Sequence, residues 1–185
     1  MIDEYNADRT GWARFSDDKR MRYRLARSLT GSPVIVRDSI VLGDRICTFL
    51  MLNPSTADAF ALDPTVRRCV GFARDLDADV LQVVNLFALR STDPDALYEP
   101  GDIGDGHLND GEIIGACTGS VFVIAGWGVH GALRRGSGGI PRGRAVKEML
   151  QDRLGFSPMH LGLTKAGHPK HPLYLKATTQ PEAWA

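Results

Sequence analysis

Short runs of apolar residues end abruptly at polar or aromatic residues, and these runs mark the expected core of the chain. They predict four buried strands, at residues 46–52, 80–86, 121–125 and 159–163. Apolar runs of this length are typical of parallel strands that are covered on both faces. Polar patches stand at their ends, at Asn53, Asn85, Gly126-Trp127-Gly128 and residues 168–174. Because open α/β sheets bind ligands beyond the carboxyl ends of their strands, the patches predict one shared cleft.

Helical patterns separate the predicted strands. Asp63 and Pro64 are a favourable N-cap and first residue of a helix, and an apolar stripe follows them. Residues 109–116 predict a second helix, and the amphipathic segment 141–154 predicts a third. We expect a short helical piece at residues 94–98.

The alternation of strands and helices predicts the fold class. We expect one three-layer α/β/α domain over residues 21–185, with a central, mostly parallel sheet of four strands. Residues 34–36 and 39–42 predict two short strands or a hairpin, and the polar residues 1–20 predict a loosely packed arm.

Composition narrows the class of protein. The 185 residues carry 22 Lys and Arg and 22 Asp and Glu, so any nucleic-acid site must be a local patch. The three cysteines form no CxxC pair, which argues against a zinc ribbon or a disulfide framework and favours the reducing cytoplasm. No signal peptide or membrane-spanning run is recognisable, and we expect a monomer without a metal or another cofactor.

Two asparagines at strand ends are the first candidates for chemistry. Asn53 can orient a water molecule, although an Asn-Pro pair is also a common turn. Asn85 offers donors and an acceptor that match the edge of a nucleobase. Phe60 and Phe87 are candidates for stacking on a flat ring, and the alternative for Phe87 is a place in the core. Trp127 is a third aromatic candidate, or a packing residue between sheet and helix.

Cations and hydroxyls suggest where an anion would bind. Arg67 and Arg68 occupy the first turn of the predicted helix, where the helix dipole does not favour cations, so they face phosphate or pair with nearby carboxylates. Ser55 and Thr56 bind an anion or simply form a turn. The remaining candidates all belong to the last loop: Lys165, His168, Lys170, His171, Leu173 and Tyr174.

The last loop lacks a third ligand at zinc spacing, so donation to a developing anion is the better interpretation of its two histidines. The alternative is a cationic surface loop. His168 is slightly favoured as the functional residue, because it lies closer to the predicted strand end.

Two resemblances cover these patches. In order and character, residues 51–55, 83–89, 124–128 and 168–174 resemble the four motifs of the uracil-DNA glycosylase superfamily. From residue 21 to residue 174, the chain also resembles an uncharacterised bacterial and phage family classified as a domain of unknown function. That resemblance is carried by Asn-Pro-Ser-Thr, Asp-Pro-Thr, Asn-Leu-Phe and His-Pro-x-His-Pro-Leu-Tyr.

The superfamily resemblance implies a fold like that of uracil-DNA glycosylase and a nucleobase-recognising enzyme. The simplest activity is that of a DNA glycosylase in DNA repair, which hydrolyses the N-glycosidic bond of a modified or damaged base. By this analogy Asn53 positions water, Asn85 reads the flipped base, and His168 or His171 binds the leaving oxygen. Phe60 or Phe87 stacks on the base. Leu173 or Tyr174 enters the duplex.

The chain departs from the superfamily at three points. Met51 replaces a glycine of the first motif, the last loop has one additional residue, and no acidic residue follows Leu52 to activate water. Two rival functions therefore stay open. One is a hydrolase or transferase acting on a free nucleotide or nucleoside, which suits the neutral charge, and the other is a non-catalytic module that binds modified bases.

Overall fold

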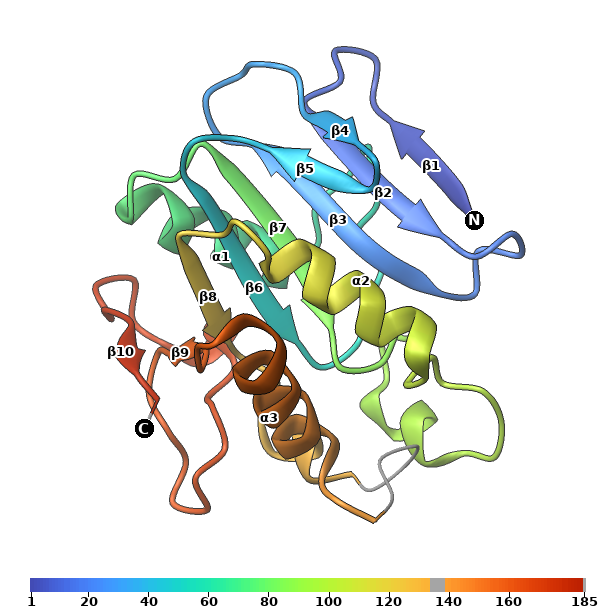
Figure 1. Ribbon diagram of the computed structural model, residues 1–185, viewed down its shortest axis with the longest axis vertical. Helices are drawn as coiled ribbons and strands as arrows, with labels where there is room; N and C mark the ends of the chain where they lie inside the picture. Colours follow the sequence, from blue (N-terminus) through green and yellow to red (C-terminus); the bar gives the residue numbers. More distant parts are fainter. Residues whose placement is uncertain (134–138, 185) are drawn as a thin grey trace.

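One mixed sheet of eight strands is the framework of the molecule (Figure 1). The computed structural model describes residues 1–133 and 139–184. The strand order is β1-β2-β3-β7-β6-β8-β9-β10. The strands of this sheet are β1 (Ile2–Tyr5), β2 (Gly11–Phe15), β3 (Arg22–Ser28), β6 (Ile46–Met51), β7 (Val80–Asn85), β8 (Phe122–Ala125), β9 (Met159–His160) and β10 (Glu182–Ala183). The expected hairpin is present as β4 (Ile35–Arg37) and β5 (Ile40–Leu42), which pair with each other.

The predicted four-stranded, mostly parallel sandwich like uracil-DNA glycosylase is wrong. Of the seven pairings within the described sheet, four are antiparallel. Only β7, β6, β8 and β9 run parallel to one another, whereas β3, β2 and β1 extend the sheet in antiparallel fashion on one side and β10 on the other. Arginines interrupt the apolar pattern of β2 and β3, so these strands do not have the apolar signature of buried strands.

Residues 1–20 belong to the sheet instead of forming the expected loose arm. β1 pairs with β2, and β2 pairs with β3. Trp12, Ala13 and Phe15 of β2 are buried in the core. Arg14 lies between them and interrupts the apolar pattern of this short strand. It can be buried because Asp3 and Glu112, from other elements of the fold, pair with its charge.

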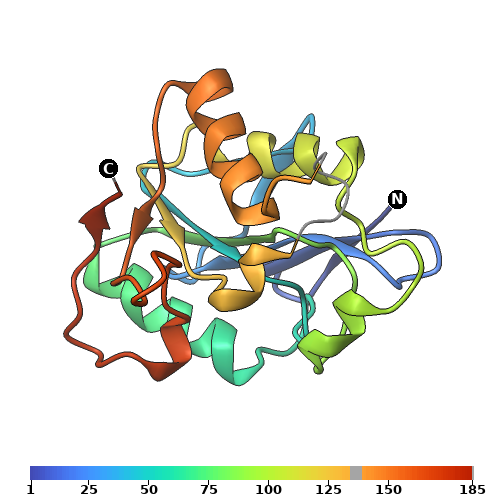
Figure 2. The ribbon, with the colours of Figure 1, turned by 90° about the horizontal axis from the view of Figure 1, so that it is seen from below.

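Helices cover both faces of the sheet (Figure 2). Helix α1 (Pro64–Asp75) lies on one face, and α2 (His107–Cys117) and α3 (Arg142–Leu154) lie on the other. Phe49, Leu81 and Phe72 belong to the apolar cluster on the α1 face, and Leu50 and Leu150 belong to the cluster on the opposite face. Three short 3₁₀ helices lie in the described connections: η1 (Pro94–Tyr98) after β7, η2 (Val129–Ala132) after β8 and η3 (Pro172–Tyr174) after β9.

The predicted start of α1 is confirmed. The side chain of Asp63 accepts a hydrogen bond of 2.8 Å from the Val66 N–H, and Pro64 occupies the first helical position. Proline fits there because its missing N–H is not needed in the first turn. This start places Asp63 at the carboxyl edge of the parallel strands, beside the site described below.

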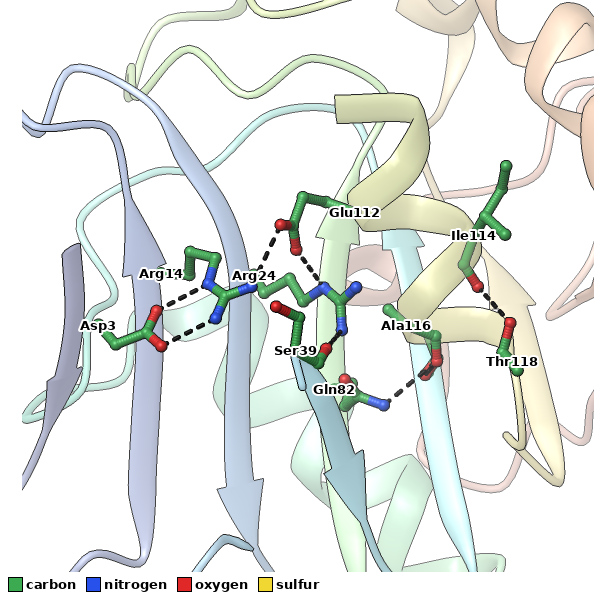
Figure 3. A network of polar contacts seen from close by, with 10 residues as sticks. Asp3, Arg14, Arg24, Ser39, Gln82, Glu112, Ile114, Ala116 and Thr118 are labelled. Atoms are coloured by element: carbon green, nitrogen blue, oxygen red, sulfur yellow. Dashed lines mark hydrogen bonds and ion pairs between the residues drawn. The ribbon is translucent and has the colours of Figure 1, made fainter. Parts of the chain in front are cut away.

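A network of ion pairs holds α2 against the antiparallel strands (Figure 3). Glu112 of α2 pairs with Arg14 of β2 and with Arg24 of β3, at 3.2 Å and 2.6 Å. Arg14 also makes two hydrogen bonds to Asp3 of β1, at 2.7 and 2.8 Å. Each charged side chain in this network pairs with one of opposite charge, so the stability of the fold accounts for its burial.

Within the described residues, no helix is both long and apolar enough to cross a membrane. Cys47, Cys69 and Cys117 are free and buried, and burial raises the pKa of the Cys47 and Cys117 thiols to about 12.

Candidate active site

A cleft of about 750 Å³ opens at the carboxyl ends of the parallel strands. Its floor is formed by the ends of β6 and β7, through Met51, Val83 and Asn85. Its walls are the loop after β6, the first turn of α1, the loop after β8 and the loop of residues 164–175. Arg22 of β3 and the segment 91–94 also line it, so segments that are far apart in the sequence contribute side chains to one cavity.

Asn53 is held by its donors and leaves its acceptor available. Its Nδ2 donates to the carbonyl oxygens of Ser91 at 2.9 Å, Pro54 at 3.2 Å and Leu89 at 3.4 Å. Among the described residues, its Oδ1 has no hydrogen-bond partner. Since Asn53 lines the cleft, this amide is fixed in an orientation that accepts a hydrogen bond from a ligand or from water.

Asn85 ends β7 with a side chain that is 1% exposed and lines the cleft. Its Nδ2 has no partner in the described structure. Its backbone is fixed from behind, because Asn109 of α2 donates to the carbonyl oxygens of Asn85 and Leu86 at 3.0 and 3.1 Å. A buried amide without a partner is costly, so its place in the cleft indicates a ligand that satisfies it.

His171 presents a donor to the same cleft. The Leu173 N–H donates to its Nδ1 at 3.3 Å, so a neutral ring carries its proton on Nε2. Desolvation lowers the pKa of His171, and the nearby negative charge of Asp63 opposes this effect in part. The neutral ring with a free Nε2–H is therefore favoured, and such a donor can stabilise a developing negative charge.

Arg22 places a buried cation in the cleft. Its side chain, in the first residue of β3, is 1% exposed and lines the cavity. Its Nη1 donates to the carbonyl oxygen of Ala57 at 2.5 Å, and its Nε is buried without a partner. Desolvation lowers the pKa of Arg22 to about 10, which leaves it protonated at neutral pH, and Asp63 is the main opposing influence.

Asp63 is the one carboxylate among the described lining residues of the cleft. One of its oxygens caps α1, as described above. It thus combines a structural bond with a negative charge inside the cavity.

Trp127 forms the wall between this cleft and a second cavity of about 440 Å³. It is 2% exposed, and its ring packs 5.5 Å from the ring of Trp184. Gly131 and Gly143 make room for the indole, because a Cβ at either position would lie within 2.2 to 2.7 Å of a Trp127 ring atom. Trp127 therefore acts as a packed wall of the cleft.

The sequence profile of a family described as "Protein of unknown function (DUF1643)" matches residues 22–173. The chain belongs to this family. The DUF1643 match includes every lining residue of the cleft except Tyr174 and Leu175. No curated protein and no solved structure matches the chain.

The two histidines of this DUF1643 chain face different cavities. His171 lines the cleft, whereas His168 lines the second cavity with Trp184. Residues 164–168 form a tight turn, in which the Thr164 N–H donates to the His168 carbonyl oxygen at 2.8 Å and the His168 N–H donates to Thr164 Oγ1 at 3.1 Å. The turn directs His168 away from the cleft. The expectation that His168 is the functional histidine, because it lies closer to the strand end, therefore does not agree with the structure.

The other candidates divide in the same way. Those that line the cleft are Ser55, Lys170, Leu173 and Tyr174. Phe60 is 66% exposed and lies outside it, and Phe87 is buried in the core. Thr56, Arg67, Arg68 and Lys165 also lie outside the cleft lining. Arg67 and Arg68 donate instead to the carbonyl oxygens of Leu62 and Leu175.

Sequence reasoning missed Arg22 and recognised Asp63 only as a helix cap. A usable signal was present: residues 22–27 read Arg-Tyr-Arg-Leu-Ala-Arg, with three arginines among β-forming and apolar residues. All six are buried, so each arginine needs an explanation by pairing or by function.

Proposed function

We propose that this cleft is the active site of an enzyme that recognises a nucleobase and hydrolyses its N-glycosidic bond, acting as a DNA glycosylase on a modified or damaged base. The observation that carries the proposal is the meeting of the free Oδ1 of Asn53, the unpartnered Nδ2 of Asn85 and the Nε2–H of His171 around one cavity. Uncharged donors and acceptors at fixed positions match the polar edge of a flat heterocycle. A volume of about 750 Å³ is also ample for one nucleotide unit.

The reaction breaks the bond between C1′ of the sugar and the base nitrogen. The electron pair leaves with the base, which becomes an anion, and the sugar becomes cationic at C1′. A water molecule adds at C1′ and loses a proton, and a proton restores the neutral base. Overall, one water molecule is consumed, and the products are the free base and the hydroxylated sugar.

The residues of the cleft suit these charges. The Nε2–H of His171 donates to an oxygen of the leaving base, and Asn53 Oδ1 accepts a hydrogen bond from the water. The carboxylate of Asp63 stabilises the cationic sugar. The order of the four polar motifs, which resembles that of the uracil-DNA glycosylase superfamily, supports the same roles for Asn53, Asn85 and the last loop.

DNA as the substrate is supported by the mouth of the cleft. Leu173 and Tyr174 line it and are 40% and 83% exposed, which suits apolar side chains that enter a duplex and replace the extruded base. Lys170 lines the mouth and Lys165 is exposed, so these cations are available for phosphate contacts.

A second candidate function is the hydrolysis of a free nucleoside or nucleotide. It is favoured by the equal numbers of acidic and basic residues, since a DNA-binding protein generally carries a net positive charge. Salt separates the two candidates, because DNA binding weakens steeply as the salt concentration rises and the binding of one small nucleotide does not.

The test is base release from two parallel substrate sets, duplex oligonucleotides with one modified base each and the corresponding free nucleosides. We expect release from at least one duplex, and a loss of about 100- to 1000-fold in rate for His171→Ala. The matched control is His168→Ala, from the same loop but outside the cleft, which should retain the wild-type rate. Hydrolysis of nucleosides alone would establish the second candidate, and tight duplex binding without release would indicate a binding module.

A further inference from the structure

Arg22 and Asn85 each present to the cleft a hydrogen-bond donor that has no partner among the described residues. Arg22 begins β3 and Asn85 ends β7, and these neighbouring strands are antiparallel, so both residues stand at the same edge of the sheet. Each side chain is 1% exposed and lines the cavity. Within residues 1–133 and 139–184, the Nε of Arg22 and the Nδ2 of Asn85 are both buried without a hydrogen-bond partner.

Protein architecture does not account for the unused donors of Arg22. Arg27, on the same strand, uses Nη1 and Nη2 to bind the carbonyl oxygens of Ala59 and Asp58, at 2.5 and 2.6 Å, and does not line the cleft. Arg22 makes one comparable bond, to Ala57, and keeps its remaining donors. No carboxylate of the described residues lies within ion-pair distance of it. A buried guanidinium with unused donors fits a ligand that supplies the acceptors.

We propose that Arg22 and Asn85 read the edge of a 6-oxopurine, in which the O6 and N7 acceptors are adjacent, and that Arg22 is the specificity-determining residue. This inference rests on the proposed recognition of a nucleobase. Hypoxanthine, xanthine and guanine present this pair of acceptors, and an arginine fork matches O6 and N7 of guanine in two parallel bonds. A guanidinium has only donors, so Arg22 favours an acceptor on the base in every orientation. The Asn85 amide has a donor and an acceptor, so a 180° turn of its side-chain amide would reverse its preference.

The same donors disfavour the other bases. Adenine has an amino group at position 6, so its donor would face the donors of Arg22. A uracil or thymine ring offers O4 with a carbon on one side, so it supplies one acceptor where the floor presents two donors. The pair of hypoxanthine and adenine isolates this effect, because along the edge formed by position 6 and N7 the two bases differ only at position 6. During bond cleavage, the positive charge of Arg22 would also favour the anionic form of the leaving purine.

The ligand-side test measures equilibrium binding of the wild-type chain to oligonucleotides with one central purine on a 2′-fluoro sugar, which slows bond cleavage. Hypoxanthine should bind about 10- to 100-fold more tightly than adenine. 7-Deazahypoxanthine, which lacks the N7 acceptor, should lose about 10-fold relative to hypoxanthine. The same three bases as free nucleosides form a second arm, which shows whether the edge is read in DNA or in a small molecule. Equal affinities for hypoxanthine and adenine in both arms would overturn the inference.

The protein-side test compares Arg22→Met with the matched control Arg27→Met. Both variants lose a contact to the loop after β6, so general loosening should weaken the binding of hypoxanthine and adenine equally. Only Arg22→Met should reduce their affinity ratio towards one, and an unchanged ratio in folded Arg22→Met would overturn the role of Arg22. If Arg22→Met does not fold, the three purines on the wild-type chain decide the question. The failures are distinguishable: a hypoxanthine preference without base release contradicts the hydrolysis but supports this inference, whereas base release without the preference overturns this inference alone.

Discussion

Two arginines of β3, Arg22 and Arg24, have opposite electrostatic surroundings, and a register shift in the pairing of β2 with β3 lies between them. Arg24 pairs with Glu112 at 2.6 Å and donates to the Ser39 carbonyl oxygen at 2.7 Å, within the network of Figure 3. Among the described residues, Arg22 has only the Ala57 carbonyl oxygen as a hydrogen-bond partner, and it opens onto the cleft. Both are almost completely buried. Burial alone therefore does not distinguish the two arginines, and the proposal for Arg22 rests on an unpartnered Nε together with a place in the cleft lining.

The two faces should respond differently to mutation. On the α2 face each charge stabilises its partners, so removal of one leaves another buried and uncompensated. On the cleft face, Arg22 Nε and Asn85 Nδ2 have no partner among the described residues, so these two groups contribute no hydrogen bond to folding and are available to a ligand. The predictions below test this contrast, from the largest expected effect to the smallest.

Glu112→Ala should be the most destabilising change on the α2 face. It leaves Arg14 without one partner and Arg24 without its only carboxylate, and the loss of one member of a buried ion pair costs about 3–5 kcal/mol. Urea denaturation measures the free energy of unfolding, and the folded fraction should bind purine oligonucleotides normally. A loss below about 1 kcal/mol, the value typical of exposed ion pairs, would show that this network does not stabilise the fold.

Asp63→Asn should separate the structural role of this residue from its charge. Asparagine caps helices as well as aspartate does, so the free energy of unfolding should change by less than about 1 kcal/mol. The rate of base release should fall on the order of 100-fold, because the carboxylate no longer stabilises the cationic sugar. Unfolding and base release are therefore measured on the same variant. An unchanged rate of base release would exclude Asp63 from the mechanism and leave only its role as the cap of α1.

Local sequence patterns predict several strand and helix boundaries of this molecule. They do not predict features that depend on contacts between residues far apart in the sequence. The abrupt ends of the apolar runs located Asn53 and Asn85 at strand ends, and the Asp63-Pro64 pair located the start of α1. The antiparallel strands β1 to β3 were not predicted, because a charged Arg14 within β2 argues against a buried strand. Its burial depends in part on pairing with Glu112, which lies 98 residues away in the sequence. The same limit applies to Arg22, because only the folded chain reveals that its Nε is buried without a partner among the described residues.

The turn chemistry of the last loop was equally beyond the sequence. Two histidines separated by two residues looked equivalent, and distance from the strand end favoured His168. The bonds between Thr164 and His168 reverse the chain there, so that His171 is the residue in the cleft. Such a reversal depends on side chain and backbone bonds within five residues, which periodicity does not encode.

His171 should make the stability depend on pH with a definite sign. Burial lowers its pKa in the folded chain below the usual 6.5, so the unfolded chain binds a proton first as the pH falls. Relative to His171→Asn, which retains a side-chain acceptor for the Leu173 N–H, the wild-type free energy of unfolding should decrease as the pH falls from 7 to 5. Thermal or urea unfolding of both proteins across this range measures the difference. A difference that grows in favour of the wild type at low pH would mean that the histidine is protonated in the fold.

The contrast between the two arginines is tested most directly by the free energies of unfolding of Arg22→Met and Arg24→Met, measured side by side in urea without any ligand. Arg24→Met should lose several kcal/mol, because it leaves the buried Glu112 carboxylate with a weakened set of partners. Arg22→Met should stay within about 1 kcal/mol of the wild type or exceed it, because an unpaired buried cation is replaced by an apolar chain of similar length. If Arg22→Met were destabilised as strongly as Arg24→Met, Arg22 would be a structural residue and the cleft would lose its central feature.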